Sequence, residues 1–194
     1  MKRLAVLCLI AGISCNVTTP SPSPVPAPVT STPVTVPPSH CAIRGVLPDP
    51  VCTPGATNPD VTPDTIGSTI CVPGWTKTIR PPMSYTDALK VQQIAEYGYG
   101  DTATADYEED HLVSLELGGS PTDPRNLWPE PHYGSPNAAN KDQVENYLKA
   151  QVCAGKRALA DVQRGIATDW TQFLSAVAVE AQDVSAEDPD DNGE

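Results

Sequence analysis

The segment Tyr107–Leu117 carries a period-two pattern of hydrophobic and polar positions. One set of alternate positions, His111, Val113, Leu115 and Leu117, is apolar apart from the histidine. The positions between them are mixed. Because successive side chains of a strand point to opposite faces, this alternation predicts a β-strand. The Gly118-Gly119 pair that follows it predicts a turn.

A second, shorter strand is expected at Asn126–Trp128, after a loop over Ser120–Arg125. Proline has no backbone N–H to donate to a neighbouring strand. We therefore expect Pro129 and Pro131 to interrupt the pairing beyond Trp128.

Helical spacing of apolar residues predicts two helices beside these strands. The first is expected over Tyr85–Tyr97, with Ser84 as its N-cap. The second is expected from about Asn137 to Val152, where Ser135 fits an N-cap and Pro136 a first helical residue. The order strand, turn, strand, helix predicts an α+β fold.

A last helix is expected from about Ala158 to Ala181, because apolar side chains recur there at helical spacing: Leu159, Val162, Ile166, Trp170, Phe173 and Leu174. Residues 41–82, in contrast, are rich in proline, glycine, threonine and aspartate. We expect loops in that region, with one short helix near Pro63–Ile70.

Residues 1–15 have the composition of a secretory signal peptide. Two basic residues precede the apolar run Leu4–Ile13, which is much shorter than the ~20 residues that span a bilayer. We therefore expect the protein to be exported. Ser14-Cys15 also fits a bacterial lipoprotein cleavage site, in which case a lipid on Cys15 would anchor the protein to the outer face of the membrane.

Residues 16–40 predict a linker, and residues 181–194 predict an acidic, disordered tail. From Asn16 to Ser39 the chain has no charged residue and eight prolines, a composition typical of an extended polyproline spacer. The tail lacks aromatic residues and cannot bury a core. The folded domain is therefore expected over residues 41–180.

Four of the six cysteines lie in the part expected to be exported: Cys41, Cys52, Cys71 and Cys153. In an oxidising compartment an even number of cysteines predicts two disulfides. We expect one bridge within the N-terminal loop region and one from that region to Cys153. Zinc is the alternative, but the closest spacing here is eleven residues, unlike the Cys-x-x-Cys pairs of zinc sites.

The net charge of −12 argues against a broad surface for binding nucleic acid. Residues 40–175 alone carry ten basic and seventeen acidic side chains. Any phosphate contact must therefore be local and assisted by a metal ion. The chain has no Walker loop, no dinucleotide fingerprint and no Gly-x-Ser-x-Gly motif, so we expect no dinucleotide cofactor.

Three segments together carry a resemblance to a known family: EDHLVSLELGG, NLWPEP and KDQVENYLKAQVCAG. They resemble HNH-type nucleases of the ββα-metal group, in particular exported HNH endonuclease-like proteins of actinobacterial or phage type. The similarity covers roughly Cys52 to Trp170. It implies an α+β fold with a small ββα-metal core, to which additional helices and a disulfide-pinned N-terminal loop region are added.

The resemblance assigns roles to three residues. His111 matches the histidine that acts as general base on water, and an imidazole titrating near 6.5 suits that task. Asp110 matches the acid that binds a divalent metal, for which its hard oxygen favours Mg²⁺ or Mn²⁺. Asn126 matches the asparagine that orients the histidine or braces the loop. Adjacent residues of a regular strand point to opposite faces, so Asp110 and His111 can share a site only where the strand ends, bulges or twists.

The family's further metal ligand, on the helix, has no clear match, because Ala138 stands three residues before Lys141. Asn137 is our choice, with Asn140 and His132 as alternatives. Asn137 shares a helical face with Lys141 and Glu145, which could present an amide to metal, an ammonium to phosphate and a carboxylate to hold that ammonium. The alternative is an exposed, salt-bridged helix face. Glu108 and Glu109 are outer ligands or simply solvated acids.

The resemblance implies a monomeric, metal-dependent endonuclease that hydrolyses phosphodiester bonds in DNA, with RNA as a further substrate. Two other functions stay open. One is a catalytically inactive, envelope-associated binding module that retains the fold, which the acidity favours. The other is an exported hydrolase for a different phosphodiester.

Overall fold

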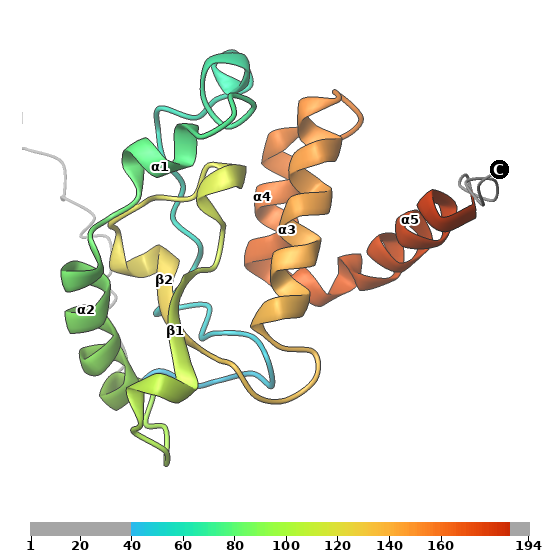
Figure 1. The fold of residues 1–194 in the computed structure, drawn as a ribbon. Helices are drawn as coiled ribbons and strands as arrows, with labels where there is room; N and C mark the ends of the chain where they lie inside the picture. Colours follow the sequence, from blue (N-terminus) through green and yellow to red (C-terminus); the bar gives the residue numbers. More distant parts are fainter. Residues whose placement is uncertain (1–39, 187–194) are drawn as a thin grey trace, which may run out of the picture. The chain divides into compact units, whose positions relative to one another are not determined.

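The computed structural model describes residues 40–186. In this part the chain forms a mixed α+β fold around a two-stranded antiparallel sheet (Figure 1). The strands and the longer helices are, in chain order, α1 (Trp75–Ile79), α2 (Met83–Glu96), β1 (Tyr107–His111), β2 (Leu127–Pro131), α3 (Ala138–Cys153), α4 (Leu159–Asp169) and α5 (Leu174–Ala186). The predictions for the signal peptide, for Cys15, for the linker up to Ser39 and for residues 187–194 lie outside the described residues.

The two strands pair over their whole length, with His111 opposite Leu127 and Glu108 opposite Glu130. β2 therefore continues through its two prolines, and the expectation that they would interrupt the pairing is wrong. In a sheet of two strands each strand needs backbone donors on one edge only, so proline is tolerated on the other edge. The register places two glutamates directly across from each other.

β1 ends at His111, and the prediction of a strand as far as Leu117 is wrong. Beyond His111 the chain turns into the interior, where Leu112 and Val113 are 1% and 0% exposed, and it forms a 3-10 turn at Leu115–Leu117. A loop that enters the core buries successive side chains, whereas a strand buries alternate ones. The end of β1 is the position at which Asp110 and His111 can both serve one site.

The turn predicted at Gly118-Gly119 is present, and both glycines are required. Gly118 has a φ of 78°, in the left-handed region that side chains disfavour. A Cβ atom on Gly119 would lie 1.7 Å from the carbonyl oxygen of Val113. The absence of these side chains lets the loop after β1 fold back against its own backbone.

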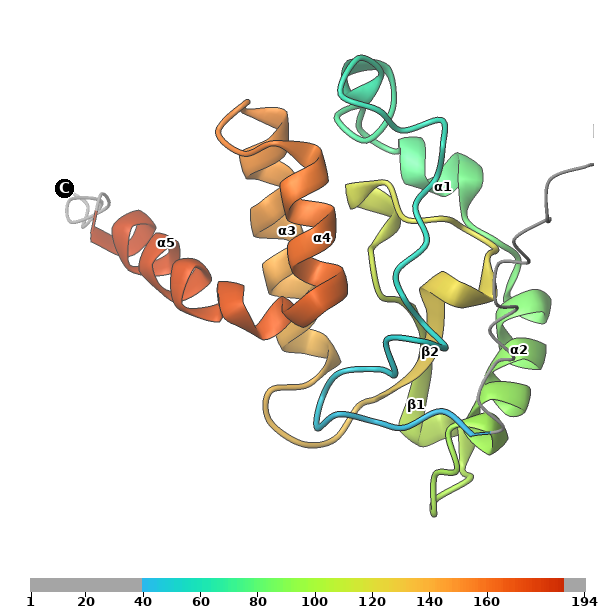
Figure 2. The ribbon, with the colours of Figure 1, turned by 180° about the vertical axis from the view of Figure 1, so that it is seen from behind.

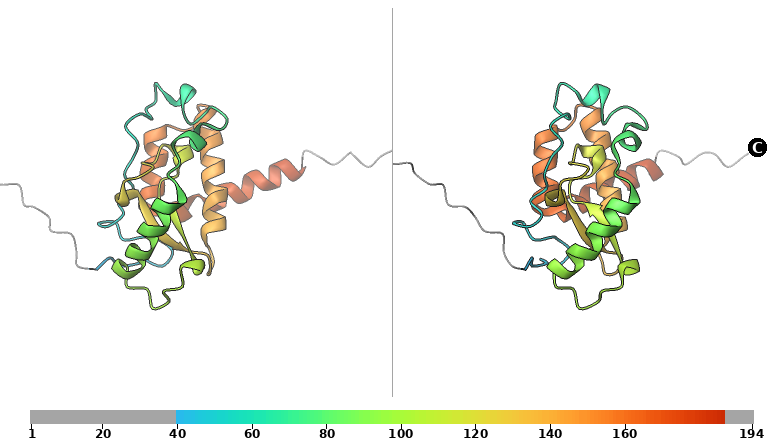
Figure 3. Two further views of the ribbon diagram at one scale, coloured as in Figure 1. Left: turned by 60° about the vertical axis from the view of Figure 1, so that its left-hand side comes forward. Right: turned by 90° about the vertical axis from the view of Figure 1, so that its left-hand side faces the viewer.

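The sheet lies between α2 and α3 (Figures 1 and 3). α2 packs against both strands, and α3 packs against α4 and α5. α2 follows Pro82, so Ser84 lies inside the helix and is not the N-cap that we expected. Among the described residues, no helix combines the length and the apolar character that crossing a membrane requires.

α3 begins at Ala138, with Asn137 as its N-cap. The side chain of Asn137 accepts a hydrogen bond from the backbone of Asn140, and the side chain of Asn140 accepts one from the backbone of Asn137. The prediction of Ser135 as N-cap and Pro136 as first helical residue is therefore wrong. Reciprocal capping by two asparagines sets the start of α3.

The long helix predicted from Ala158 to Ala181 is divided into three parts. At Asp169 the backbone becomes extended, with a φ of −166°, and the Asp169 side chain accepts a hydrogen bond from the backbone of Thr171 at 2.9 Å. A 3-10 turn, Trp170–Phe173, then leads into α5, which continues away from α3 and α4 (Figure 2). α5 ends at Ala186, so residues 181–186 are helical and the prediction of a disordered tail is wrong for them.

The core consists of two clusters of buried apolar side chains. The larger joins α3, α4 and the 3-10 turn after α4 to the loop beyond β1, and its members include Val113, Leu117, Val144, Leu148, Ile166 and Trp170. The smaller joins the end of α2 to β2 through Tyr97, Leu112 and Trp128. Leu112 and Val113 therefore anchor the end of β1 in both clusters.

Both expected disulfides are confirmed. Cys41 is bonded to Cys52 within the N-terminal loop region, and Cys71 is bonded to Cys153. The second bond joins the segment before α1 to the last residue of α3. Because all four cysteines are paired, the zinc alternative is wrong.

Replacing Cys71 and Cys153 together with serine is expected to destabilise the fold by about 4.5 kcal/mol, because a long loop gains the most freedom in the unfolded chain. The matched control replaces Cys41 and Cys52, whose sequence separation is 11 against 82, and is expected to cost about 2.8 kcal/mol. Chemical denaturation followed by circular dichroism measures both. A larger loss for the Cys41–Cys52 pair would contradict the loop argument.

Candidate functional site

A polar cavity of about 430 Å³ lies where the end of β1, the first turns of α3 and the end of α1 come together. β1 contributes Glu108 to His111, and α3 contributes Asp142, Glu145 and Asn146. Arg80, which follows α1, is the only arginine or lysine among the described residues that line the cavity. An acid, a histidine and an arginine therefore share one water-accessible space.

His111 is 5% exposed, and its Nε2 atom lies 3.0 Å from the carbonyl oxygen of Pro121. A carbonyl oxygen only accepts, so Nε2 must carry the proton and donate it. The other ring nitrogen, Nδ1, then keeps its lone pair. Burial lowers the pKa of His111, although the bond to Pro121 and the charge of Asp110 act in the opposite direction. The imidazole is neutral at neutral pH and can accept a proton at Nδ1.

Asn126 is fully buried and makes three side-chain hydrogen bonds. Its Oδ1 accepts from the backbone N–H of Val113 at 3.0 Å, and its Nδ2 donates to the carbonyl oxygens of Val113 at 2.9 Å and Ser120 at 3.0 Å. Ser120 precedes Pro121, the partner of His111. Asn126 thus braces the loop that orients the imidazole, and the structure records no direct hydrogen bond between the two side chains within the described residues.

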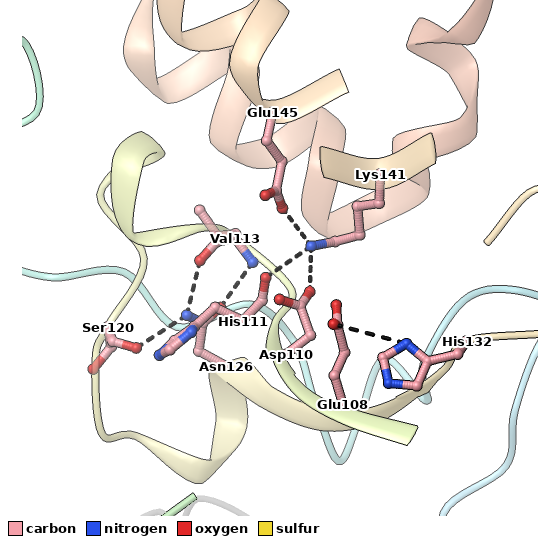
Figure 4. Close-up of polar contacts among 9 residues, drawn as sticks. All are labelled: Glu108, Asp110, His111, Val113, Ser120, Asn126, His132, Lys141 and Glu145. Carbon is pink, nitrogen blue, oxygen red and sulfur yellow. Dashed lines mark hydrogen bonds and ion pairs between the residues drawn. The ribbon is translucent and has the colours of Figure 1, made fainter. Parts of the chain in front are cut away.

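Lys141 is buried to 1% exposure and reaches β1 from the first turn of α3. Its ammonium donates to Asp110 Oδ2 at 2.5 Å, to the main-chain oxygen of His111 at 2.9 Å, and to Glu145 Oε1 (Figure 4). Burial opposes the charged form, but the carboxylates of Asp110, Glu145 and Glu130 raise the pKa of Lys141 well above its usual value. Lys141 is therefore a fixed cation in the interior.

More carboxylates surround this ammonium than it can neutralise. Burial raises the pKa of Glu145 to about 8, although Lys141 acts against that change. Burial raises the pKa of Glu108 to about 7, and the charge of Asp110 adds to the effect. Burial also raises the pKa of Glu130. For Asp110, in contrast, burial is outweighed by Lys141, and its pKa is lowered. Because the carboxylates outnumber the ammonium, the cluster favours the binding of a further positive charge.

Carboxylate oxygens of Glu108, Asp110 and Glu130 all lie within 4.8 Å of one another. Glu130 is 2% exposed, and its Oε2 atom is buried without a hydrogen-bond partner among the described residues. Glu130 was not singled out from the sequence. Only the register of β1 against β2 brings it opposite Glu108, and that register depends on a strand passing through two prolines.

The side chains of Asp110 and His111 diverge from the end of β1. Figure 4 shows Asp110 directed toward Lys141 and Glu145, whereas the imidazole extends toward the loop that carries Ser120. Both residues nevertheless line the same cavity. Adjacent strand residues can line one cavity only where the strand ends, bulges or twists, and β1 ends at His111.

Asn137 does not join this group. Its side chain caps α3, and it lines a second cavity of about 160 Å³, which Glu130 also lines. The expectation of one continuous face over Asn137, Lys141 and Glu145 is therefore wrong, because an N-cap has an extended backbone and not a helical one. The alternative of an exposed, salt-bridged face is also wrong, since Lys141 and Glu145 are buried.

The two other candidates for a helix ligand are also engaged elsewhere. Asn140 completes the capping box of α3. His132 is half exposed and its Nδ1 lies 3.9 Å from Glu108 Oε2. Arg80, in contrast, reaches the cavity although no sequence pattern indicated it, because the loop region before α2 has no periodicity from which its direction could be derived.

Comparisons with known proteins identify no relative of this chain: no family model, no curated protein and no solved structure matches it. The chemistry of the site must therefore be argued from its own geometry.

Replacing Asn126 with alanine is expected to lower the free energy of unfolding by about 2–4 kcal/mol, because the N–H and carbonyl groups of Val113 would stay buried without partners. Urea denaturation measures the change. Asn146→Ala is the control: its exposed side chain donates one bond to the Asp142 backbone, and its loss is expected to cost less than about 0.5 kcal/mol. Equal losses would contradict the bracing role.

Proposed function

We propose that this protein is a metal-dependent hydrolase of phosphodiester bonds, with DNA as its preferred substrate. The observation that carries the proposal is the hydrogen bond from His111 Nε2 to the Pro121 carbonyl. That bond leaves Nδ1 with its lone pair, and His111 lines the same cavity as Asp110. A neutral, oriented imidazole beside a carboxylate cluster has the parts needed to activate water near a metal ion.

The residues present fit a hard divalent cation. The donor set around Asp110 consists of carboxylates, which Mg²⁺ and Mn²⁺ prefer. The buried Oε2 atom of Glu130 has no partner in the described part of the chain, and a cation would supply one. Asp110 and Glu130 would hold the ion, which when bound would offset the charge that develops on the scissile phosphate.

The other steps of the proposed reaction are assigned to side chains of the protein. His111 takes a proton from water at Nδ1, and Pro121 and the Asn126 brace fix the direction of that nitrogen. Lys141 is too deeply buried to touch substrate, so it acts by positioning the Asp110 carboxylate. Glu145 in turn holds Lys141. The role of Lys141 as a phosphate contact, expected from the sequence, is thus replaced by a positioning role.

Arg80 is the side chain suited to bind phosphate. It is exposed, and within the described residues its guanidinium makes no hydrogen bond or ion pair, although six acidic residues line the same cavity. A guanidinium can donate two parallel hydrogen bonds to a phosphate. A contact through one local arginine needs no broad basic surface, so it is compatible with the net charge of −12.

We also propose that the protein works outside the cytoplasm. Its two disulfides are typical of oxidising compartments. The apolar N-terminal run is consistent with export, and Cys15 with a lipid anchor as the alternative to release.

A catalytically inactive binding module is the second candidate. The observation that favours it is the Lys141 ammonium, which already occupies the oxygens of Asp110, Glu145 and the His111 backbone. In that case the cluster would serve stability alone, and the cavity would bind a partner without chemistry.

The purified chain is expected to nick supercoiled plasmid in Mg²⁺ or Mn²⁺, to be inactive in EDTA, and to lose about 10²- to 10⁴-fold in rate as His111→Ala. His40→Ala is the matched control, since His40 is exposed at the edge of the described domain. Intact plasmid with every metal would favour the binding module. Cleavage of small phosphodiesters but not of plasmid would indicate a different diester substrate.

Replacing Arg80 with alanine is expected to raise KM for DNA about 10- to 100-fold, because a charge-assisted hydrogen bond to phosphate contributes about 1.5–3 kcal/mol. Arg80→Lys should recover part of the loss, since lysine keeps the charge but not the bidentate geometry. Steady-state kinetics on a short duplex measure this. Arg164→Ala, at an exposed residue paired with Asp161, is the control; a KM increase equal to that of Arg80→Ala would refute a specific phosphate contact.

A further inference from the structure

The hairpin of β1 and β2 presents three carboxylates on one face. Glu108 and Glu130 lie directly opposite each other in the register, and Asp110 follows two residues after Glu108 on the same face of β1. Their oxygens lie within 4.8 Å of one another. Like charges opposite each other destabilise a hairpin, and either protons on the carboxyl groups or a bound cation can relieve that repulsion.

Glu130 provides an independent sign of a ligand. It is 2% exposed, and its Oε2 atom is buried without a hydrogen-bond partner in the described part of the chain. A buried carboxylate oxygen without a partner carries a large desolvation cost. The Glu130 side chain belongs to the group of three and lies close enough to Asp110 for both to bind one ion.

The neighbouring group of oxygens is already filled. Lys141 donates to Asp110 Oδ2, to the His111 main-chain oxygen and to Glu145 Oε1. A cation in that position would have to displace a buried ammonium. The carboxylate of Glu145 on α3 is therefore engaged, whereas Glu108 receives no hydrogen bond from the described residues, and Glu130 contacts Asp110 while its Oε2 atom has no partner.

We infer that a hard divalent cation binds to Glu108, Asp110 and Glu130, so that every protein ligand comes from the hairpin and none from α3. This inference deepens the proposed function and rests on it for the identity of the ion. Three carboxylates and no histidine or cysteine favour Mg²⁺, Mn²⁺ or Ca²⁺ over zinc or copper. β2 supplies through Glu130 the ligand that we had expected from the helix, and water completes the coordination on the open side toward the cavity.

Binding can be measured without substrate. Titration of the full chain with Mn²⁺ in a calorimeter gives the Kd directly. Tb³⁺ serves as a second probe of oxygen sites, because Trp128 lies opposite Asp110 in the register and its excitation would sensitise a bound lanthanide. Wild type is expected to bind one Mn²⁺ and to show Tb³⁺ emission that Mn²⁺ or Ca²⁺ competes away.

Four isosteric variants locate the site. Glu130→Gln and Glu108→Gln are each expected to weaken Mn²⁺ binding at least about tenfold, since each replaces a charged carboxylate ligand with a neutral amide. Glu145→Gln and Glu109→Gln remove the same charge from α3 and from the position next to Asp110, and both should change the Kd much less. If Glu130→Gln fails to fold, Glu108→Gln, at a partly exposed side chain, decides.

Two results would overturn the hairpin site. One is a wild-type chain that binds no Mn²⁺ and gives no competed Tb³⁺ emission. The other is a Glu145→Gln variant that loses as much affinity as Glu108→Gln or more, which would place the ion among the oxygens that hold Lys141. Failure of the proposed function has a different signature: Mn²⁺ binding with the expected variant pattern, but no cleavage of any phosphodiester.

Discussion

The buried ammonium of Lys141 connects the parts of the candidate site. Through Asp110 and the main-chain oxygen of His111 it fixes two consecutive residues of β1 to the first turn of α3. A charge removed from water is tolerated only where counter-charges lie close by, and removal of one partner leaves the other uncompensated. The same ion pairs therefore determine both the position of the hairpin relative to α3 and the charge balance of the site. Glu145 completes the ion pair from one helical turn further along α3.

The imidazole depends on a different set of contacts. His111 donates to Pro121, and Asn126 holds Ser120 and the backbone of Val113. These bonds are between neutral groups, so the orientation of the base does not depend on how the carboxylate cluster is protonated. The ion pairs of Lys141 hold the end of β1 from the α3 side, and the neutral hydrogen bonds of Asn126 and Pro121 hold it from the loop side. This division allows Asp110 and His111 to be adjacent in the chain while they have separate tasks.

The sequence was sufficient for the parts of the fold that local patterns determine. The mixed α+β class, the glycine turn and the helix from about residue 137 were predicted correctly, as were two disulfides with one of them reaching Cys153; which cysteine pairs with Cys153 was not predicted. The length of β1 was not, because alternation in Val113, Leu115 and Leu117 comes from a loop that enters the core and not from a sheet face. Glu130 and Arg80 could not be found, since one depends on strand register and the other on the path of a loop. Asn137 was misassigned because helical spacing was applied to a residue that caps the helix.

The bond between Cys71 and Cys153 has a practical consequence for anyone who wishes to produce the protein. It connects the segment leading to Arg80 with the far end of the helix that carries Lys141, two walls of one cavity. A bacterial cytoplasm keeps thiols reduced, so protein made there would lack this disulfide. The protein should therefore be expressed with a periplasmic leader, or refolded under oxidising conditions and checked for free thiols. A lack of activity can be attributed to the site only in protein prepared in this way.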